Sequence, residues 1–327
     1  MTLRLLIFVF LTLSFQAEAD EIFKKKMFLM GCNFEITVVA NSQAEANQFT
    51  LLAEAEITRI ENLISSWDSE SETSRINLNA GLKPVKVAPE LLQLIERSIG
   101  LSKLTDGAFD ITYASMDKVW MFDGSMQEKP SEIAIQKSVE LVDFKNIEIN
   151  KEASTVFLKK KGMKIGFGGI GKGYAADKAK QLLQYNGVKG GIINASGDMN
   201  TWGNKPNGNP WEVAITNPLD KTKAFGLVPI INRAVVTSGN YEKYIVFDGV
   251  LYSHIIDPRT GYPATGILSV TVFAPKAELA DALATSVFVM GINVGLNRIE
   301  QIPGVDCIIV DEKGELYQTK NIKIKSN

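Results

Sequence analysis

The chain has 327 residues, of which 45% are hydrophobic and 22% are charged, and its formal net charge is -2. This composition is that of an ordinary globular protein and excludes a largely disordered chain. The longest basic runs, at 24–26 and 159–161, hold three lysines each. We expect them to be solvated turns, and the charge pattern argues against nucleic-acid binding.

The N-terminus is typical of a cleaved secretory signal. Arg4 precedes an apolar run at 5–15, and a small-x-small pattern ends at Ala19. The run is too short for a permanent transmembrane helix, and no later segment reaches the necessary length. We predict that 1–19 is removed, that 20–327 forms the mature protein and that it is exported to the periplasm. Association with the outer face of the inner membrane is left open.

Cys32 raises two further questions about the exported chain. The sequence LMGC at 29–32 resembles a lipoprotein attachment box, but the lysines at 24–26 separate it from the apolar run, so lipidation is not expected. An oxidising compartment would permit a disulfide with Cys307, yet two cysteines so far apart in sequence do not establish one. Two buried free thiols are the expected state.

Apolar periodicity predicts interleaved strands and helices along the rest of the chain. A strand at 33–39 precedes a long helix with apolar positions from Phe49 to Ile64, and Pro89 opens a helix to Leu104 that ends at the TDGAFD loop. Later helices are expected at 131–142, 174–185, 276–290 and 293–302. Strands are expected near 147 and at 154–159, 190–196, 211–216, 234–238, 244–247, 267–274, 305–311 and 315–319. The order lacks a regular βαβ alternation and predicts an α+β fold in a single domain, with two lobes as the alternative.

A glycine-rich stretch, KIGFGGIGKGYAADKA at 164–179, partly matches two nucleotide-binding patterns. Residues 166–171 read G-x-G-x-x-G, but the acid expected about 20 residues later is replaced by Asp198 in a predicted Ser-Gly-Asp turn. Residues 166–172 read as most of a P-loop, yet Gly173 stands where a magnesium-binding Ser or Thr is needed. The glycines would still let the backbone approach an anionic ligand, and a tight turn without a ligand is the open alternative.

Seven segments in a fixed order resemble the ApbE family of exported flavin transferases. They are SSWDSESETSRIN, TDGAFD, GGIGKGYAADKA, INASGDM, TSGNYEKY, YSHIIDPRTGYPA and ELADALATSVFVMG, within 30–291. The resemblance implies an α+β fold similar to the T-fold and magnesium-dependent transfer of FMN from FAD to a threonine or serine, with AMP leaving. The implied acceptor is an exported or membrane-embedded redox subunit, as in a sodium-pumping quinone reductase or a related complex.

Asp281 and Thr285 are candidates for the magnesium site. They are four residues apart on a predicted helix, so their oxygens share one side and suit a hard cation. The resemblance adds the backbone carbonyl of Gly171 as a third ligand. Taken without it, the two residues would more simply be a helix N-terminal charge and a packed hydroxyl.

His254 is the only histidine in the chain, and it follows a predicted strand beside an Asp-Pro turn. Such a histidine is well placed for proton transfer, and the resemblance implies catalysis or contact with the pyrophosphate, with a structural histidine as the alternative. Lys172 is expected to add electrostatic stabilisation, and Asp281 is also a catalytic candidate.

The resemblance also implies which residues contact FAD. Those expected at the flavin and adenine rings are Met30, Trp67, Ala108, Phe109 and Asp110. Those expected nearer the pyrophosphate or ribityl chain are Gly168, Tyr174 and Ile255. Further candidates are Asp177, Asn194, Asp198, Ser238, Gly239 and Tyr241. Each aromatic side chain here is equally compatible with a core position, and Trp67 is the one expected to be partly exposed.

Three positions depart from the family pattern, which commonly has an acid at Gly166, threonine at Cys32 and tyrosine at Trp67. The loss of an acid bears on metal affinity and on the balance between transfer and hydrolysis. An exported FAD pyrophosphatase, a non-catalytic FAD carrier or scavenger, and a Rossmann-type oxidoreductase therefore remain as alternatives.

Overall fold

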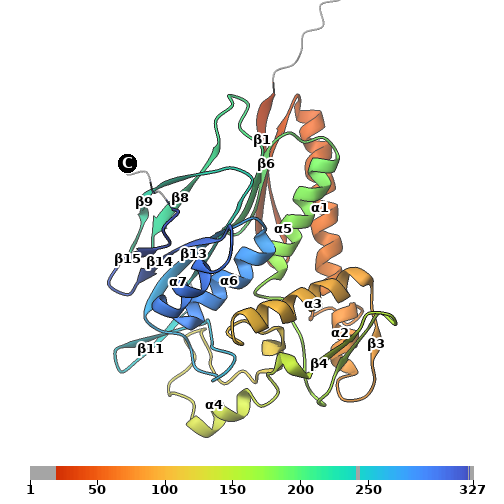
Figure 1. Cartoon of the computed structure of the whole chain (residues 1–327), viewed down its shortest axis with the longest axis vertical. Helices are drawn as coiled ribbons and strands as arrows, with labels where there is room; N and C mark the ends of the chain where they lie inside the picture. The colour runs from red at the N-terminus through yellow and green to blue at the C-terminus, as the bar shows by residue number, and fades with distance from the viewer. Residues whose placement is uncertain (1–19, 241–243, 323, 325–327) are drawn as a thin grey trace, which may run out of the picture.

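The computed structural model describes residues 20–240, 244–322 and 324 (Figure 1). The predicted signal at 1–19 and the candidate Tyr241 lie outside the described residues. Within the described part of the chain, no helix is both long enough and apolar enough to cross a membrane.

The fold consists of strands and helices in irregular succession. The strands are β1 (Glu21–Leu29), β2 (Cys32–Ala40), β3 (Val85–Lys86), β4 (Ile147–Asn150), β5 (Thr155–Leu158), β6 (Gly191–Ala195), β7 (Asp198–Trp202), β8 (Trp211–Asn217), β9 (Asp220–Ile230), β10 (Ala234–Gly239), β11 (Tyr244–Phe247), β12 (Val250–Ser253), β13 (Ile267–Ala274), β14 (Asp306–Asp311) and β15 (Leu316–Gln318). The helices are α1 (Gln43–Ile64), α2 (Glu72–Leu78), α3 (Pro89–Leu104), α4 (Glu132–Ser138), α5 (Gly171–Tyr185), α6 (Ala277–Met290) and α7 (Ile292–Glu300), with 3-10 turns η1 (Ile111–Ser115) and η2 (Phe144–Asn146).

An antiparallel eight-stranded sheet is the centre of the molecule, in the order β1-β2-β6-β7-β10-β13-β14-β15. Helices α1, α5 and α6 cover one face, and the β8–β9 hairpin packs on the other (Figure 1). Every residue of β13 is buried because both faces are covered at its position. The expected α+β fold with antiparallel sheets is therefore confirmed.

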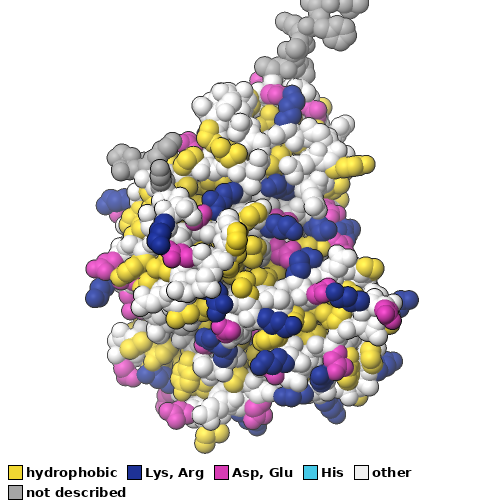
Figure 2. All heavy atoms as spheres, viewed as in Figure 1, with side chains coloured by type: hydrophobic (Ala, Val, Ile, Leu, Met, Phe, Trp, Pro, Cys, Tyr) yellow, Lys and Arg dark blue, Asp and Glu magenta, His cyan; other side chains and the backbone are white. Residues whose placement is uncertain are grey.

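A lower part of the molecule is built from α2, α3 and a small sheet in the order β3-β5-β4 (Figure 1). Its buried side chains, such as Leu94 and Val156, belong to the same hydrophobic cluster as Ile36 of β2 and Leu283 of α6. One continuous core thus joins the two parts and holds the loops between them. Charged side chains of both signs are interspersed over the face shown in Figure 2.

Several elements differ from the sequence prediction. The lysines at 24–26 lie in β1 and not in a turn, because β1 pairs with β2 along its whole length and Lys24 and Lys26 lie 3.5 and 3.8 Å from Glu35 carboxylate oxygens. Strands β1, β3, β7 and β9 and helix α2 were not predicted, and Asp198 begins a strand. Helix α4 ends at Ser138 and not at Val142, and α5 begins at Gly171, three residues before the expected start.

Helices α5 and α6 cross at very short range at Gly173. A Cβ atom on this residue would lie 2.2 Å from the Ala277 carbonyl oxygen, far inside van der Waals contact. Glycine is therefore required here because the two backbones touch, and not because of its φ angle.

We predict that Gly173→Ala destabilises the fold by about 2 kcal/mol or more, because α5 and α6 must move apart. Gly100→Ala is the matched control, since Gly100 is exposed in α3 and a Cβ atom there would meet nothing within 4 Å. The control should gain about 0.5–1 kcal/mol from helix propensity. Urea unfolding followed by circular dichroism measures both changes, and equal stability of the two variants would contradict the close crossing.

Candidate active site

A charged pair of one half-buried lysine and one buried aspartate lies where α5 meets the central sheet. Lys172 is the second residue of α5, and its ammonium group forms an ion pair with the carboxylate of Asp198, the first residue of β7. Burial alone would lower the pKa of Lys172, but the nearby Asp281 and Asp198 carboxylates outweigh it and raise that pKa. The lysine therefore carries its positive charge at neutral pH.

Asp281 and Thr285 project from α6 toward the same region. The buried carboxylate of Asp281 accepts a hydrogen bond of 3.1 Å from the Gly173 backbone N–H. Burial raises the pKa of Asp281, while the Lys172 ammonium and this N–H favour the charged form. Thr285 lies one turn further along, and its Oγ1 is 3.5 Å from Ser238 Oγ at the end of β10. Oxygens from α6 and β10 thus converge beside a lysine.

The glycine stretch reaches Thr285 through Gly169. A Cβ atom on Gly169 would lie 3.8 Å from Thr285 Oγ1 and 3.6 Å from the Phe109 ring. At Gly171 the nearest atoms belong to Ile64, Phe167 and Met30. Gly171 opens α5, so its carbonyl points along the helix axis toward the N–H four residues on. The sequence predicted Gly171 and Gly168 of this stretch as site residues but not Gly169, because the family resemblance implied the first two.

The oxygen donors fit a hard divalent cation. A buried carboxylate, a hydroxyl and a neighbouring backbone carbonyl are the kinds of ligand that Mg²⁺ takes, completed by water or phosphate. Among the residues that the structure describes, no group of three or more His, Cys, Asp or Glu could hold a metal ion. One carboxylate and one hydroxyl would leave most positions of an octahedral cation to water or phosphate oxygens.

Two loops with predicted ring-contact residues border the glycine stretch. Ser66, in the loop after α1, has its Oγ 3.7 Å from where a Cβ atom on Gly166 would lie. The next residue, Trp67, is 87% exposed, and the Lys118 ammonium lies 5.5 Å from its ring centroid. The expectation of an exposed Trp67 is confirmed. Around Gly168 a Cβ atom would meet nothing within 4 Å, so this glycine leaves open space beside the loop.

The other loop, TDGAFD, is fixed mainly by its own polar groups. Ala108 and Phe109 are buried, and the Phe109 N–H donates to Thr105 Oγ1 at 3.1 Å. The Asp110 carboxylate accepts from the Thr112 N–H at 2.7 Å and from the Phe144 N–H at 2.9 Å. Because Asp110 holds η1 and η2 together, its carboxylate is committed to the loop.

His254 follows β12 and lies three residues before the DPRTG turn at 257–261, which packs on the TDGAFD loop. The histidine is half-buried, and the next residue, Ile255, is buried with its N–H on Ser253 Oγ at 3.0 Å. Arg259 binds the Asp257 carboxylate with two nitrogens, at 2.8 and 2.9 Å, and its side chain lies 3.4 Å from a Cβ position at Gly107. The two loops therefore support each other.

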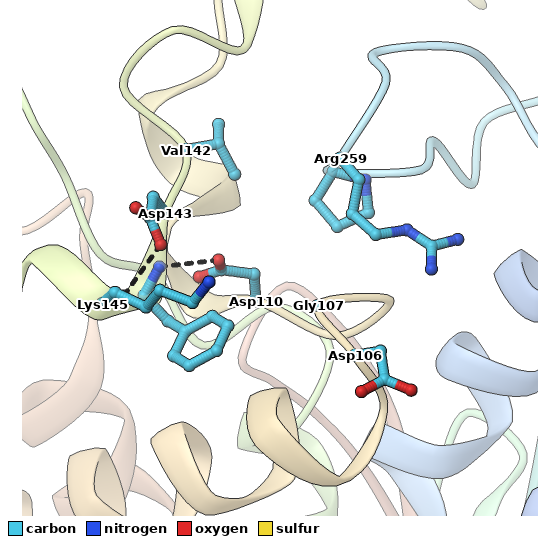
Figure 3. Close-up of a pocket in the computed structure, with 9 residues that line it drawn as sticks. Asp106, Gly107, Asp110, Val142, Asp143, Lys145 and Arg259 are labelled. Atoms are coloured by element: carbon cyan, nitrogen blue, oxygen red, sulfur yellow. Dashed lines mark hydrogen bonds between the residues drawn. The ribbon is translucent and has the colours of Figure 1, made fainter.

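A cavity of about 220 Å³ lies between these loops (Figure 3). Arg259 lies on one side of it and Asp143 and Lys145 on the other, with Asp110 between them. A second hollow of about 530 Å³ lies at the β11–β12 hairpin and is lined mainly by apolar residues. It contains none of the predicted site residues, and the first borders only Asp110.

The Tyr174 hydroxyl and the Met30 N–H bond to other residues of the protein, so these two groups are already occupied. The Tyr174 hydroxyl donates to Glu90 Oε1 at 2.7 Å, and its buried ring has Arg97 and Lys178 each 5.5 Å from the centroid. Met30 adopts a positive φ of 50° in the β1–β2 turn, where its N–H donates to Glu61 at 3.0 Å. Tyr174 supports α5 from the side of α3, and Met30 reaches α5 next to Gly171.

Both cysteines are free thiols in the structure. Cys307 is buried, but Cys32 is only half-buried, which corrects the expectation for that residue. Burial raises the pKa of the Cys32 thiol, and the charge of Lys172 opposes this rise. Cys32 therefore lies at the edge of the same cluster.

The sequence of this chain is similar to those of a known protein family. Residues 30–309 match the sequence pattern of the ApbE family. The FAD:protein FMN transferase of Treponema pallidum is 32% identical over 277 residues, which cover 80% of this chain and 75% of the relative. The Escherichia coli K12 protein of the same name is 30% identical over 267 residues, covering 79% and 75%.

Solved structures give the same result. The ApbE protein of Thermotoga maritima has a TM-score of 0.83 and 32% identity, with 92% of this chain and 97% of that chain covered. The flavin transferase ApbE of Vibrio cholerae has a TM-score of 0.81 and 25% identity, with 92% and 98% covered. Both chains are therefore similar to this one over almost their whole length.

We predict that Glu90 contributes acid-sensitive stability to the helices behind the site. Hydrogen bonds from Arg59, Tyr174 and Lys178 lower the pKa of Glu90 from 4.5 to about 2. The stabilisation is therefore present above pH 4.5 and is lost as the pH falls toward 2. Glu90→Gln should lower the melting temperature at pH 7 by a few degrees and flatten its fall between pH 4.5 and 2.

Glu96→Gln is the control for this titration, because Glu96 is an acid on the same helix, 46% exposed and paired with Lys151. It should leave the pH profile of the melting temperature unchanged. Parallel acid profiles for wild type and Glu90→Gln would show that Glu90 does not contribute in this way.

Proposed function

Because this chain belongs to the ApbE family, we propose that it is an FAD:protein FMN transferase, which moves FMN from FAD to a hydroxyl group of another protein. Relatives at 30–32% identity bear this name. We propose further that the acceptor is a threonine or serine and that AMP leaves. The observation that carries the proposal is the meeting of Lys172, Asp281 and Thr285 beside the glycine stretch.

In the proposed reaction, a bond forms between the acceptor oxygen and the phosphorus on the FMN side. The bond from that phosphorus to the bridging oxygen of the pyrophosphate breaks, and this oxygen leaves with AMP. The acceptor hydroxyl proton passes to His254, since a neutral imidazole accepts a proton near neutral pH. Proton transfer of this kind contributes about 10²- to 10⁴-fold to a rate.

Magnesium is the proposed metal. Asp281 and Thr285 would hold it together with a backbone carbonyl of the glycine stretch. The resemblance gives Gly171 for that carbonyl, and Gly169, where a Cβ atom would lie 3.8 Å from Thr285 Oγ1, is a second candidate in the same stretch. When bound, the ion supplies positive charge against the negative charge of the pyrophosphate.

Lys172 is proposed to hold a second positive charge beside the pyrophosphate. Its pairing with Asp198 restricts the ammonium group, and its raised pKa keeps the group charged. A fixed charge in a buried site acts without reorganising as the reaction proceeds. Removal of such a group typically lowers kcat by about 10²- to 10³-fold.

The proposed FAD site combines rings and open backbone around this cluster. Trp67 offers an exposed ring, Phe109 lies against Gly169, and Gly168 leaves room for a ligand. Met30, Ala108 and Ile255 would add apolar surface. Asp110 would act by shaping its loop, and Tyr174 by supporting α5, because their polar groups bond elsewhere in the protein.

We also propose that the protein acts after export to the periplasm. The signal-like sequence at 1–19 supports this. The acceptor would then be a subunit of a membrane redox complex, such as a sodium-pumping quinone reductase, with its flavin-bearing hydroxyl on the exported side.

We predict that the mature protein, incubated with FAD, Mg²⁺ and an acceptor subunit, yields a covalently fluorescent acceptor on a denaturing gel. Asp281→Asn should lower the rate at least about 100-fold, because it removes the carboxylate charge from the metal site. Glu300→Gln, an exposed acid at the end of α7, is the control and should retain full activity.

The same assay separates the other functions. Accumulation of FMN and AMP without labelled acceptor would identify an FAD pyrophosphatase. Tight FAD binding without turnover, unaffected by Asp281→Asn, would identify a carrier. Either result would overturn the transferase proposal.

A further inference from the structure

Helices α5 and α6 lack caps of their own. The residue before each helix is Ile170 for α5 and Lys276 for α6, and neither side chain makes a capping hydrogen bond. By contrast, α1 is capped by the side chain of Ser42. The first N–H groups of a helix need acceptors, particularly in a buried position. At α5 and α6 these acceptors come from the other helix.

The exchange of caps is reciprocal. Asp177, in α5, accepts the Ala277 N–H on Oδ1 at 2.9 Å and the Glu278 N–H on Oδ2 at 3.0 Å. Asp281, in α6, accepts the Gly173 N–H at 3.1 Å. Each helix thus supplies a carboxylate to the positive end of its neighbour, where negative charge is favourable.

The Asp177 carboxylate is itself held in place. Asn200 of β7 donates its side-chain N–H to Asp177 Oδ1 at 2.5 Å, and Lys180 donates to Asn200 Oδ1 at 3.0 Å. Burial raises the pKa of Asp177 to about 6. The cap therefore joins α5, α6 and the central sheet, and it lies where Gly173 and Ala277 leave no room for a shift.

We propose that Asp177 is a positioning residue: by fixing the first turn of α6 against α5, it places Asp281 and Thr285 opposite the glycine stretch. Asp281 is four residues beyond Ala277, about 6 Å along the helix, so a tilt of the first turn displaces its carboxylate. Both oxygens of the Asp177 carboxylate accept N–H groups of the first turn of α6, so the residue acts through α6 and not as the FAD contact that the resemblance suggested. The functional consequence rests on the proposed metal site, whereas the placement of α6 does not.

Hydrogen–deuterium exchange tests the placement directly. In Asp177→Ala, amide exchange should speed up at least about ten-fold at Ala277 and Glu278, and also at Gly173, whose N–H is bound to Asp281 and not to Asp177. Ser42→Ala is the matched control. It removes the cap at the N-terminal end of α1, about 33 Å along the helix from Ile64, which is the residue of α1 that lies next to Gly171. It should leave all three amides protected. Unchanged protection of Gly173 in Asp177→Ala would overturn the proposal.

A metal titration tests the consequence. Mn²⁺, an oxygen-preferring probe followed by paramagnetic resonance in the presence of FAD, should bind Asp177→Ala at least about ten-fold more weakly than wild type. Ser42→Ala should bind it normally despite a lowered melting temperature. The Mn²⁺ affinity of Asp177→Asn, which keeps one acceptor oxygen, should lie between the affinities of wild type and Asp177→Ala. Asp177→Asn replaces the alanine variant in the test if that variant does not fold.

The outcomes distinguish the two proposals. If wild type binds no Mn²⁺, the proposed metal site fails, and the exchange of Gly173 still decides whether Asp177 places α6. If wild type binds Mn²⁺ and a folded Asp177 variant binds it equally well, Asp177 is only a stabilising cap, and the positioning role is wrong.

Discussion

The closest approach of two helices, at Gly173 and Ala277, is the constraint on which the rest of the site depends. A side chain at position 173 would overlap the Ala277 carbonyl. Because the backbones touch, the buried helix ends can satisfy each other with Asp177 and Asp281. The same contact brings the end of the glycine stretch to the face of α6 that carries Thr285. This single contact between two helices thereby brings together residues that are more than 100 positions apart in the sequence.

Charge balance is the second requirement of this arrangement. Two buried carboxylates, Asp198 and Asp281, act on one half-buried ammonium group, that of Lys172. An unpaired buried charge costs several kcal/mol, so the lysine offsets much of the cost of placing acids there. Burial opposes the charged form of Asp281, and the Lys172 ammonium and the Gly173 N–H favour it.

Much of the fold could be read from local patterns, and the failures have physical causes. Long amphipathic segments such as α1 and α3 were predicted because their apolar spacing is regular. Strand β1 was missed because its lysines hide the alternation, which becomes meaningful only when Glu35 of β2 lies beside them. The start of α5 was placed late because glycines have weak helix propensity, and tertiary contact at Gly173 outweighs this.

By itself, the sequence determined the α+β class and the placement of Asp281 and Thr285 on one helix face, because these depend on the order of the elements and on spacing along one element. Only the tertiary structure decided which glycine faces Thr285, that the Tyr174 hydroxyl bonds to Glu90, and that Asp177 caps α6. These features depend on the direction of individual hydrogen bonds and on close approach between segments that are distant in the sequence. Local periodicity carries no information about either, since both are set by how the elements pack.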